Sequence, residues 1–274
     1  FVPTSVRGTS IAPILPGVDA AELDALEEGR GALGLEPFRA IAVGGEGAER
    51  FLQDLLTADI ARLAPGAAAR SLLLGPTGRI RADLHVLRQA EGFLLLQALD
   101  QPRSIAELLA PYALVADVRL QEVPPPALLA VPTPGAWRFV PAETPGLVRV
   151  SPQAVESWRI RRGIARFPVD LDEDSLPAEA GLDDGVIVAR EKGCYLGQES
   201  VAKVRNLGHP PRVVLALRAE APVRTGEAVL ALGGQVGLVT SVDPLDGAAV
   251  LARVRWEARE ERLATAGGVG LAPR

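Results

Sequence analysis

The feature that most constrains the fold is a strict alternation of apolar and polar residues over residues 80–86. Successive side chains of a β-strand point to opposite faces, so the alternation predicts a strand with one apolar and one polar face. Turn residues flank the strand at 75–78 and 91–92, and apolar runs lie beyond both turns. We therefore expect an antiparallel meander over residues 71–99. His85 is expected to lie exposed on its polar face.

Helical spacing and turn residues predict further elements on both sides of this meander. Four helices are expected, over residues 19–28, 48–56, 105–112 and 152–162. Three more strands are expected in the same half of the chain, over residues 38–43, 115–123 and 127–131. A loop that contains Pro13 and Pro16 is expected before the first helix.

The last quarter of the chain has a different pattern. After Pro210-Pro211 short apolar runs alternate with turns, and the pair Gly233-Gly234 predicts a tight hairpin. About 65 residues of strand and turn are the size of a small barrel, so we expect a C-terminal β-barrel over residues 211–274. Residues 1–210 form the remaining region, and the proline-rich stretch 123–146 predicts a seam between its two halves.

Charge and composition exclude several classes of partner. Acidic residues outnumber basic ones, 34 against 29, so the formal net charge is −5 and direct nucleic-acid binding is not expected. The single cysteine excludes an intramolecular disulfide and fits a reducing, cytoplasmic compartment. Apolar runs fall short of the roughly 18 residues of a membrane helix, so no membrane partner is expected. The chain has no Met and starts at Phe1, so we expect its natural start to lie upstream.

The most distinctive segment surrounds Cys194. It consists of Lys192, Gly193, Cys194, Tyr195, Leu196, Gly197, Gln198 and Glu199. The glycines predict a sharp turn that presents a thiol just before a helix. Lys192 and the helix dipole would favour the thiolate and so lower the pKa of Cys194.

A small buried cysteine without chemistry is the alternative for Cys194. Against it, a chain that otherwise uses arginine places both of its lysines, Lys192 and Lys203, around this cysteine. The glycines on both sides of Cys194, which have no side chains, also contribute little to packing. We therefore treat Cys194 as a functional thiol and Lys192 as its charged neighbour.

No metal site is predicted. One cysteine and two distant histidines, His85 and His209, do not supply the clustered ligands of a structural zinc site. Nothing in the sequence places His209 beside Cys194 as a catalytic base. We expect His209, which precedes two prolines, to lie in a loop.

Residues 192–199 resemble the signature of the YgfZ-type folate-binding proteins, relatives of the glycine-cleavage T-protein (GcvT). Four further segments are similar to motifs of that family in order and spacing. They are Phe51 to Ile60, Gly78 to Leu84, Arg159 to Ile164 and Leu176 to Glu179.

The resemblance implies an α+β fold, in which two related folate-binding modules of antiparallel sheet plus helices and a small C-terminal β-barrel surround a central channel. It implies a tetrahydrofolate or a one-carbon derivative as cofactor, and a role in iron-sulfur cluster assembly or repair that supports cluster-dependent enzymes, such as those of tRNA modification. The implied partners are iron-sulfur proteins or assembly factors. The implied folate-binding residues are Asp59, Asp83, Trp158, Arg159 and Arg161.

Three positions depart from the family pattern. Ala82 stands where glycine-cleavage T-proteins carry the first Asp of a pair, so glycine-cleavage aminomethyl transfer is not expected. Ala58 and Arg161 stand where the family often has Asn and an acidic residue. Arg161 donates where a carboxylate accepts, so we expect it either to meet the glutamate tail of folate or to lie with Arg159 and Arg162 on a solvated helix face.

Three functions fit these observations. The first is a folate-binding accessory protein, in which Cys194 exchanges a thiol, ligates a cluster transiently or accepts a one-carbon unit. The second is a folate-dependent aminomethyl or methyl transferase, in which Asp83 or Asp59 supplies the carboxylate near the reactive nitrogens. The third is a non-enzymatic adaptor that has lost folate binding, which Ala58 and Arg161 favour.

Overall fold

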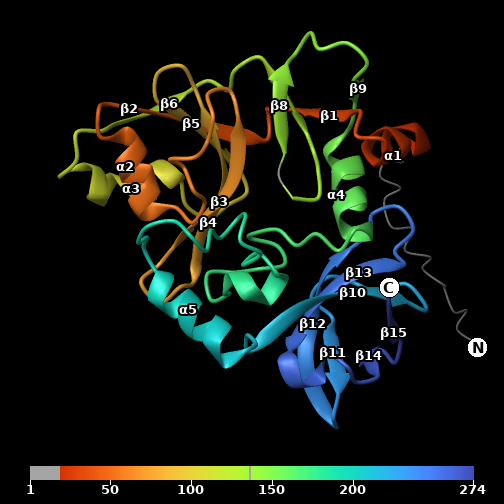
Figure 1. The fold of residues 1–274 in the computed structure, drawn as a ribbon. Coiled ribbons are helices and arrows are strands. Elements are labelled where there is room, and N and C mark those ends of the chain that lie inside the picture. The colour runs from red at the N-terminus through yellow and green to blue at the C-terminus, as the bar shows by residue number, and fades with distance from the viewer. Residues whose placement is uncertain (1–18, 136) are drawn as a thin grey trace, which may run out of the picture.

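The computed structural model describes residues 19–135 and 137–274 of the chain. The first part forms a five-stranded antiparallel sheet with the strand order β3-β4-β5-β2-β6 (Figure 1). Its strands are β2 (Phe38–Gly44), β3 (Ala68–Leu74), β4 (Ile80–Arg88), β5 (Phe93–Ala98) and β6 (Arg119–Val123). The expected loop around Pro13 and Pro16 lies outside the described residues.

The predicted meander is confirmed, and its apolar face forms the main core. Helices α2 (Ala48–Leu55) and α3 (Ile105–Ala113) cover that face and pack against Ala82, Leu84 and Val86 of β4. Ser104 caps α3 through a capping box with Glu107.

The opposite face of the meander is covered as well, contrary to expectation. Leu94 and Leu96 of β5 pack there against Val155 and Trp158 of a later helix. His85 lies on this face, and only 8% of the residue is exposed. The prediction that His85 is exposed is therefore wrong, because a second layer covers the face that the alternation assigned to solvent.

That second layer contains a four-stranded sheet with the order β8-β7-β1-β9. Its strands are β1 (Gly31–Gly34), β7 (Leu128–Val131), β8 (Arg138–Pro141) and β9 (Val148–Arg149). Strand β1 pairs antiparallel with β7 and parallel with β9. The proline-rich stretch thus carries the chain from the edge of the first sheet into the second, and part of it forms a hairpin there.

Helix α4 (Pro152–Arg161) completes this layer and runs toward the barrel (Figure 1). Ser151 caps it by accepting a hydrogen bond from the backbone of Ala154, and Pro152 occupies the first turn. The chain leaves the helix at Gly163, whose φ of +72° is readily adopted only by glycine. Helix α1 (Ala20–Glu27) packs beside α4.

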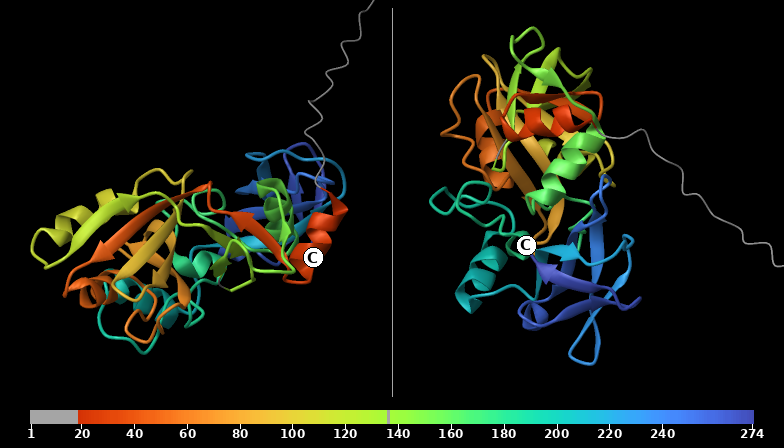
Figure 2. Two further views of the ribbon diagram at one scale, coloured as in Figure 1. Left: turned by 90° about the horizontal axis from the view of Figure 1, so that it is seen from above. Right: turned by 90° about the vertical axis from the view of Figure 1, so that its right-hand side faces the viewer.

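The C-terminal barrel is closed, with the strand order β10-β13-β12-β11-β14-β15. Its strands are β10 (Arg212–Ala219), β11 (Ala228–Ala231), β12 (Gly234–Val242), β13 (Ala249–Arg255), β14 (Leu263–Thr265) and β15 (Gly270–Pro273). The hairpin predicted at Gly233 joins β11 to β12. The sequence indicated four of these strands but not β14 and β15, which are too short to show a period. Figure 2 shows the barrel below the two sheets.

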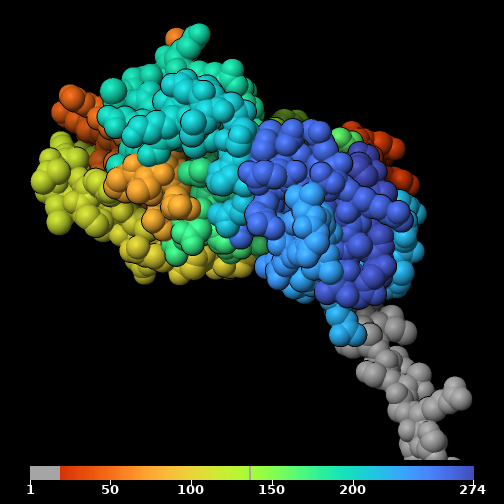
Figure 3. Space-filling view, turned by 90° about the horizontal axis from the view of Figure 1, so that it is seen from below, coloured from red at the N-terminus to blue at the C-terminus, as the bar shows by residue number. Residues whose placement is uncertain are grey.

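The segment between α4 and the barrel carries two short helices. They are the 3₁₀ helix at Pro177–Ala180 and helix α5 (Gln198–Leu207). In Figure 3 this segment, in green to cyan, lies beside the blue barrel residues. Ion pairs attach it to the barrel, between Arg253 and Asp172 at 2.5 Å and between Arg212 and Glu179 at 3.2 Å.

These observations confirm the α+β class, the antiparallel sheets and the C-terminal barrel.

Strand β6 is shorter than predicted, since it begins at Arg119 and not at Val115. After α3 the chain makes a turn, in which the backbone of Ala116 donates to Ala113 at 3.2 Å and that of Val118 donates to Ala116 at 2.9 Å, and Val115 lies exposed within this turn. The division into residues 1–210 and 211–274 stays a prediction. No helix within residues 19–135 and 137–274 has the length and apolar character needed to cross a membrane.

Candidate functional site

A cavity of about 470 Å³ lies between the outer face of the first sheet and helix α4. Its walls are largely apolar and aromatic, with contributions from Phe38, Leu96, Trp137 and Trp158. Its polar lining consists of Arg70, Asp83, His85, Asp100, Gln101, Glu156, Arg159 and Arg166. A cavity of this size and character is typical of a site for a small organic ligand.

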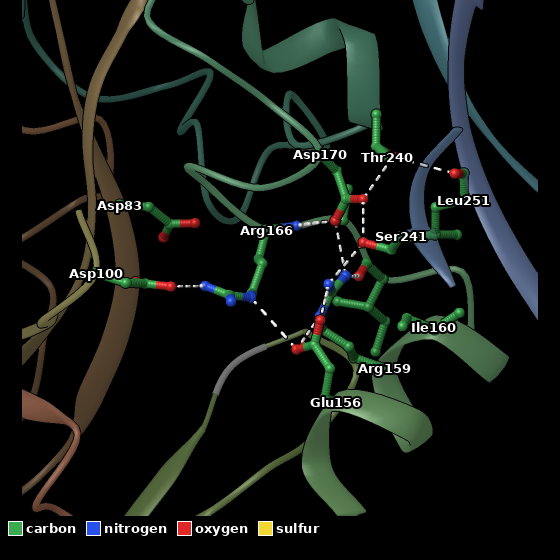
Figure 4. Close-up of polar contacts among 12 residues, drawn as sticks. Asp83, Asp100, Glu156, Arg159, Ile160, Arg166, Asp170, Thr240, Ser241 and Leu251 are labelled. Carbon is green, nitrogen blue, oxygen red and sulfur yellow. Dashed lines mark hydrogen bonds and ion pairs between the residues drawn. The ribbon is translucent and has the colours of Figure 1, made fainter. Parts of the chain in front are cut away.

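The charged side chains of this cavity are paired with one another. Arg70 and Asp83 form a two-pronged ion pair, with Nε to Oδ1 at 3.0 Å and Nη2 to Oδ2 at 2.5 Å. Arg166 pairs with Asp100 at 2.6 Å and with Glu156 at 3.4 Å (Figure 4). The positive and negative charges of the cavity lining are therefore paired with each other.

Arg159 organises the end of the cavity nearest the barrel. Its guanidinium donates to both oxygens of Glu156, to Asp170 at 2.7 Å and to Ser241 of strand β12 at 2.9 Å (Figure 4). Asp170 is buried and also accepts from Thr240 at 2.7 Å. Because Arg159 is 4% exposed, its interpretation as part of a solvated helix face is wrong.

Two neutral nitrogen atoms of the cavity lining lack a partner among the described residues. They are Nε1 of Trp158, a residue 2% exposed, and Nδ1 of His85. The His85 ring stacks on Trp137 at 5.4 Å and meets Phe139 edge-on at 5.2 Å. Burial lowers the pKa of His85 to about 4, with Asp83 opposing and Arg70 assisting the shift, so the ring is neutral at neutral pH.

The structure divides the folate-binding residues expected from the sequence among three places. Asp83, Trp158 and Arg159 line the larger cavity. Asp59 lines a smaller cavity of about 280 Å³. Arg161 extends toward the barrel, where it pairs with Asp243 at 2.6 Å. Whether these residues bind folate stays a proposal.

The smaller cavity contains Asp59 and Lys192 together with Arg62, Arg190 and Glu191. Burial lowers the pKa of Lys192 to about 8, although Asp59 opposes the shift. The Lys192 ammonium group donates to the carbonyl oxygens of Leu56, at 2.6 Å, and Ala58, at 2.8 Å. It also lies over the ring of Tyr195 at 5.3 Å.

Cys194 is exposed, as the functional interpretation requires, and it lies three residues before Gly197, the N-cap of α5. Tyr195 beside it is buried, and burial raises the pKa of Tyr195. Gln198 begins the helix, and Glu199 lies exposed in its first turn. His209 lies in a bend outside the helices and strands, as expected, and stacks on Trp256.

The two glycines of the signature have different environments. Gly193 is open to solvent, and a Cβ there would meet nothing. Gly197 has φ +84°, and a Cβ there would lie 2.5 Å from the carbonyl oxygen of Gly75 in the turn between β3 and β4. For Gly197 the expectation that glycine serves packing poorly is wrong, because only glycine lets α5 approach this turn so closely.

The two strongest sequence motifs lie against each other, namely the segment Phe51 to Ile60 and the segment around Cys194. Thr57 donates through Oγ1 to the carbonyl of Ile187 at 2.8 Å and accepts at its own carbonyl from Ala189 at 3.0 Å. The backbone of Leu196 donates to Asp54 at 3.1 Å. The residues after α2 and the residues around Cys194 therefore form one structural unit.

Ala82 does not face the larger cavity. Its side chain is fully buried in the core beneath α2 and α3, whereas Asp83, the next residue, lines the cavity. A carboxylate at position 82 would point away from a ligand. The expectation drawn from Ala82 against aminomethyl transfer stays a prediction, and the position of this pair that lines the cavity carries an aspartate, Asp83.

Several cavity residues were not identified from the sequence. They are Arg70, His85 as a buried residue, Glu156 and Arg166. Asp170, which pairs with Arg159 behind the lining, was not identified either. The spacing of Glu156 and Arg159 on one helix face was the only available signal. The others come from separate elements that only the fold brings together. Among residues 19–135 and 137–274 no three His, Cys, Asp or Glu side chains gather as metal ligands.

Comparisons with known proteins agree with this architecture. The crystal structure of the glycine cleavage system aminomethyltransferase T from Bartonella henselae superposes with a TM-score of 0.74 at 20% identity, over 92% of this chain and 88% of that chain. An aminomethyltransferase from Rubrobacter xylanophilus is 26% identical over 81% of this chain and 74% of its own length.

A relative with a different description is the iron-sulfur cluster assembly factor IBA57 homolog of Pyricularia oryzae. It is 27% identical over 64% of this chain and 54% of its own length. Residues 15–139 match the GCVT N-terminal domain family, a range that holds the first sheet and the cavity face of β4. Residues 15–139 are accordingly similar to the GCVT N-terminal domain, and the chain shares its fold with the aminomethyltransferase T of Bartonella henselae.

Proposed function

We propose that the protein binds tetrahydrofolate or a one-carbon derivative in the larger cavity. The observation that carries this proposal is the aromatic lining of a 470 Å³ cavity, with Phe38, Trp137 and Trp158 in its walls. The pyrimidine half of a reduced pterin is flat and polar at its edge, and it fits such walls. The match of residues 15–139 to the GCVT N-terminal domain family and the similarity to an aminomethyltransferase support the choice of folate.

We propose further that the bound folate serves an accessory role in iron-sulfur cluster assembly or repair. The relative named as an iron-sulfur cluster assembly factor supports this role. Asp83 supports it as well, since Arg70 occupies both of its carboxylate oxygens and would have to move before Asp83 could exchange a proton with a ligand. The partners would be iron-sulfur proteins or assembly factors.

Cys194 is the group proposed to meet such a partner. Its thiol is exposed on a surface turn. Lys192, two residues before it, and Tyr195, directly after it, are buried and anchor this turn to the interior. A thiol held in this way can reach a second protein without a large rearrangement. Thiol exchange, transient cluster ligation and acceptance of a one-carbon unit are three chemistries open to it.

The test of folate binding is an anaerobic calorimetric titration of tetrahydrofolate into the natural protein and into Cys194→Ala. We expect saturable binding of equal affinity in both, because the cavity lining does not include Cys194. Absence of binding in both would contradict the folate proposal and favour the adaptor. The accessory role predicts that Cys194→Ala, in cells that lack the natural protein, fails to restore the activity of a cluster-dependent enzyme while folate binding is retained.

A folate-dependent aminomethyl transferase is the second candidate, and the cavity position of Asp83 favours it. Asp83→Asn separates the two candidates, because it keeps the shape of the side chain and removes its basic oxygen. Loss of aminomethyl transfer to or from tetrahydrofolate in this variant, relative to a measurable rate in the natural protein, would establish the enzyme. No transfer by the natural protein would eliminate it.

A further inference from the structure

The smaller cavity is separate from the one proposed for folate. Its volume is about 280 Å³, close to the lower limit for small-molecule sites. Two segments supply its walls, residues 59–62 and 185–192, and the two cavities have no described lining residue in common. The charged side chains of its lining are Asp59, Arg62, Arg190, Glu191 and Lys192.

The ammonium group of Lys192 joins these two segments. Lys192 belongs to the second segment, and its Nζ donates to the carbonyl oxygens of Leu56, at 2.6 Å, and Ala58, at 2.8 Å. Ala58 directly precedes Asp59 of the first segment. An ammonium group has three N–H donors, and no described oxygen accepts the third. A positive charge with one unused donor therefore lies at the junction of the two walls.

Lys192 is a buried cation without a carboxylate partner. Only 8% of the residue is exposed, and no carboxylate in the described part of the chain forms an ion pair with it. Arg159, which is also buried, pairs with both Glu156 and Asp170. Burial lowers the pKa of Lys192 to about 8, although Asp59 opposes the shift. A buried charge is costly unless a counter-charge pairs with it, so a negative group in the cavity would stabilise the ammonium form.

Arg190 adds a second positive charge to the cavity wall. Its side chain lies against Gly185, where an added Cβ would be 3.4 Å from the Nε atom of Arg190. Its Nη2 donates to the carbonyl of Asp183 at 3.2 Å, and within residues 19–135 and 137–274 no carboxylate pairs with it. A guanidinium has five N–H donors in a planar fork, which fits two oxygens of a carboxylate or a phosphate.

The two carboxylates of the lining leave these charges uncompensated. Asp59 is already engaged, since it accepts from Gln53 at 3.1 Å and pairs with Arg62 at 3.4 Å. Glu191 is exposed and forms no ion pair with a described cation, so its carboxylate can stay in solvent. The charges that remain are positive, and the field in the cavity therefore favours an anion.

We propose that the smaller cavity binds the oxyanion group of a small acid, a carboxylate or a phosphate, between Lys192 and Arg190. The Lys192 ammonium group donates its third N–H to the anion, and the Arg190 guanidinium supplies two parallel donors. Because the two cavities have separate linings, this inference holds whether or not the larger one binds folate.

The experiment uses the fact that Lys192 and Lys203 are the only lysines of the chain. Protein labelled isotopically in lysine gives two sets of side-chain NMR signals, which Lys203→Arg assigns. The probes are inorganic phosphate, succinate and chloride, each added at neutral pH and constant ionic strength. Phosphate, succinate or both should shift the Lys192 signals saturably and leave those of the exposed Lys203 unchanged. Chloride, which has no pair of oxygens for the guanidinium fork, should shift neither set.

The two oxyanions also distinguish the source of the group, since the tighter probe identifies a phosphate or a carboxylate. Arg190→Gln removes one charge and keeps a polar side chain. It should raise the Kd of the tighter probe by about tenfold or more, the equivalent of one hydrogen bond between charged groups. Glu191→Gln removes the opposing carboxylate and should lower that Kd. Arg149→Gln is the matched control, because Arg149 is exposed and does not line the cavity, and it should leave the Kd unchanged.

Three results would overturn the proposal. The first is the absence of any shift of the Lys192 signals with phosphate and with succinate. The second is an equal shift of Lys192 and Lys203, or an equal response to chloride, which would show a general charge effect and no site. The third is a Kd for Arg190→Gln that equals that of the natural protein. The Lys192 signals themselves report whether each variant is folded, and none of these results bears on folate binding, which the calorimetric titration tests.

Discussion

The Nζ atom of Lys192 lies 2.8 Å from the carbonyl oxygen of Ala58 and donates a hydrogen bond to it. A second bond, to Leu56, is 2.6 Å long. Lys192, which belongs to the segment around Cys194, thus binds the backbone of the residues that directly follow helix α2. Its structural role is to satisfy two buried carbonyl groups.

Lys192→Met should lower the free energy of unfolding by about 2 to 3 kcal/mol, because two buried carbonyl oxygens lose their donor. Lys203→Met is the matched control, since Lys203 is the other lysine of the chain and is exposed. It should change stability by less than about 0.5 kcal/mol. Denaturant unfolding of the two variants checks this, and equal stabilities would contradict the buried role of Lys192.

Gly197→Ala should be more destabilising than Gly208→Ala. Both glycines have nearly the same positive φ, +84° and +86°, so alanine is strained at either position. Only at Gly197 would the added Cβ also collide with the carbonyl of Gly75, whereas nothing lies within 4 Å at Gly208. We expect about 1 kcal/mol at Gly208 and at least about 2 kcal/mol more at Gly197. Thermal unfolding of both variants measures the difference, and similar midpoints would mean that α5 moves away from the turn at little cost.

Arg159→Met should destabilise the protein by about 3 to 5 kcal/mol, because it leaves the buried carboxylate of Asp170 without its charge partner. Arg162→Met provides the comparison three residues later, where the guanidinium pairs with Glu27 at the surface. That exposed pair contributes at most about 1 kcal/mol. Urea unfolding at neutral pH distinguishes the two, and a small effect of Arg159→Met would show that Asp170 is accommodated without it.

His85 should make stability depend on pH between about 4 and 6.5. The pKa of His85 is about 4 in the folded protein and 6.5 in an unfolded chain, so within this window the unfolded state binds the extra proton. Acid therefore favours unfolding. The stability that depends on a neutral His85 is fully present above pH 6.5 and is lost as the pH falls toward 4.

The full shift corresponds to about 3 kcal/mol. The measurement is the difference in unfolding free energy between the natural protein and His85→Phe at several pH values. That difference should shift in favour of His85→Phe as the pH is lowered through the window. A difference that is constant with pH would show that His85 can be protonated without unfolding.

The local elements followed from the sequence because they depend on neighbouring residues. The alternation over residues 80–86 identified β4, and helical spacing over residues 152–162 identified α4. The short strands β14 and β15 escaped because three or four residues show no period. The exposure of His85 was mispredicted for another reason. Alternation separates two faces of a strand but does not reveal that a later helix covers the polar one.

The sequence by itself determined the C-terminal strands, the Cys194 turn and the motifs that resemble a folate-binding superfamily, since each of these rests on spacing along the chain. That resemblance in turn implied the α+β class. The tertiary structure decided which residues meet. It joined the Thr57 segment to the Cys194 segment, turned Ala82 into the core and Asp83 into the cavity, and paired Arg159 with Asp170 and Ser241. Such contacts join residues far apart in the chain, and the free energy that selects them comes from burial and pairing, which no local pattern records.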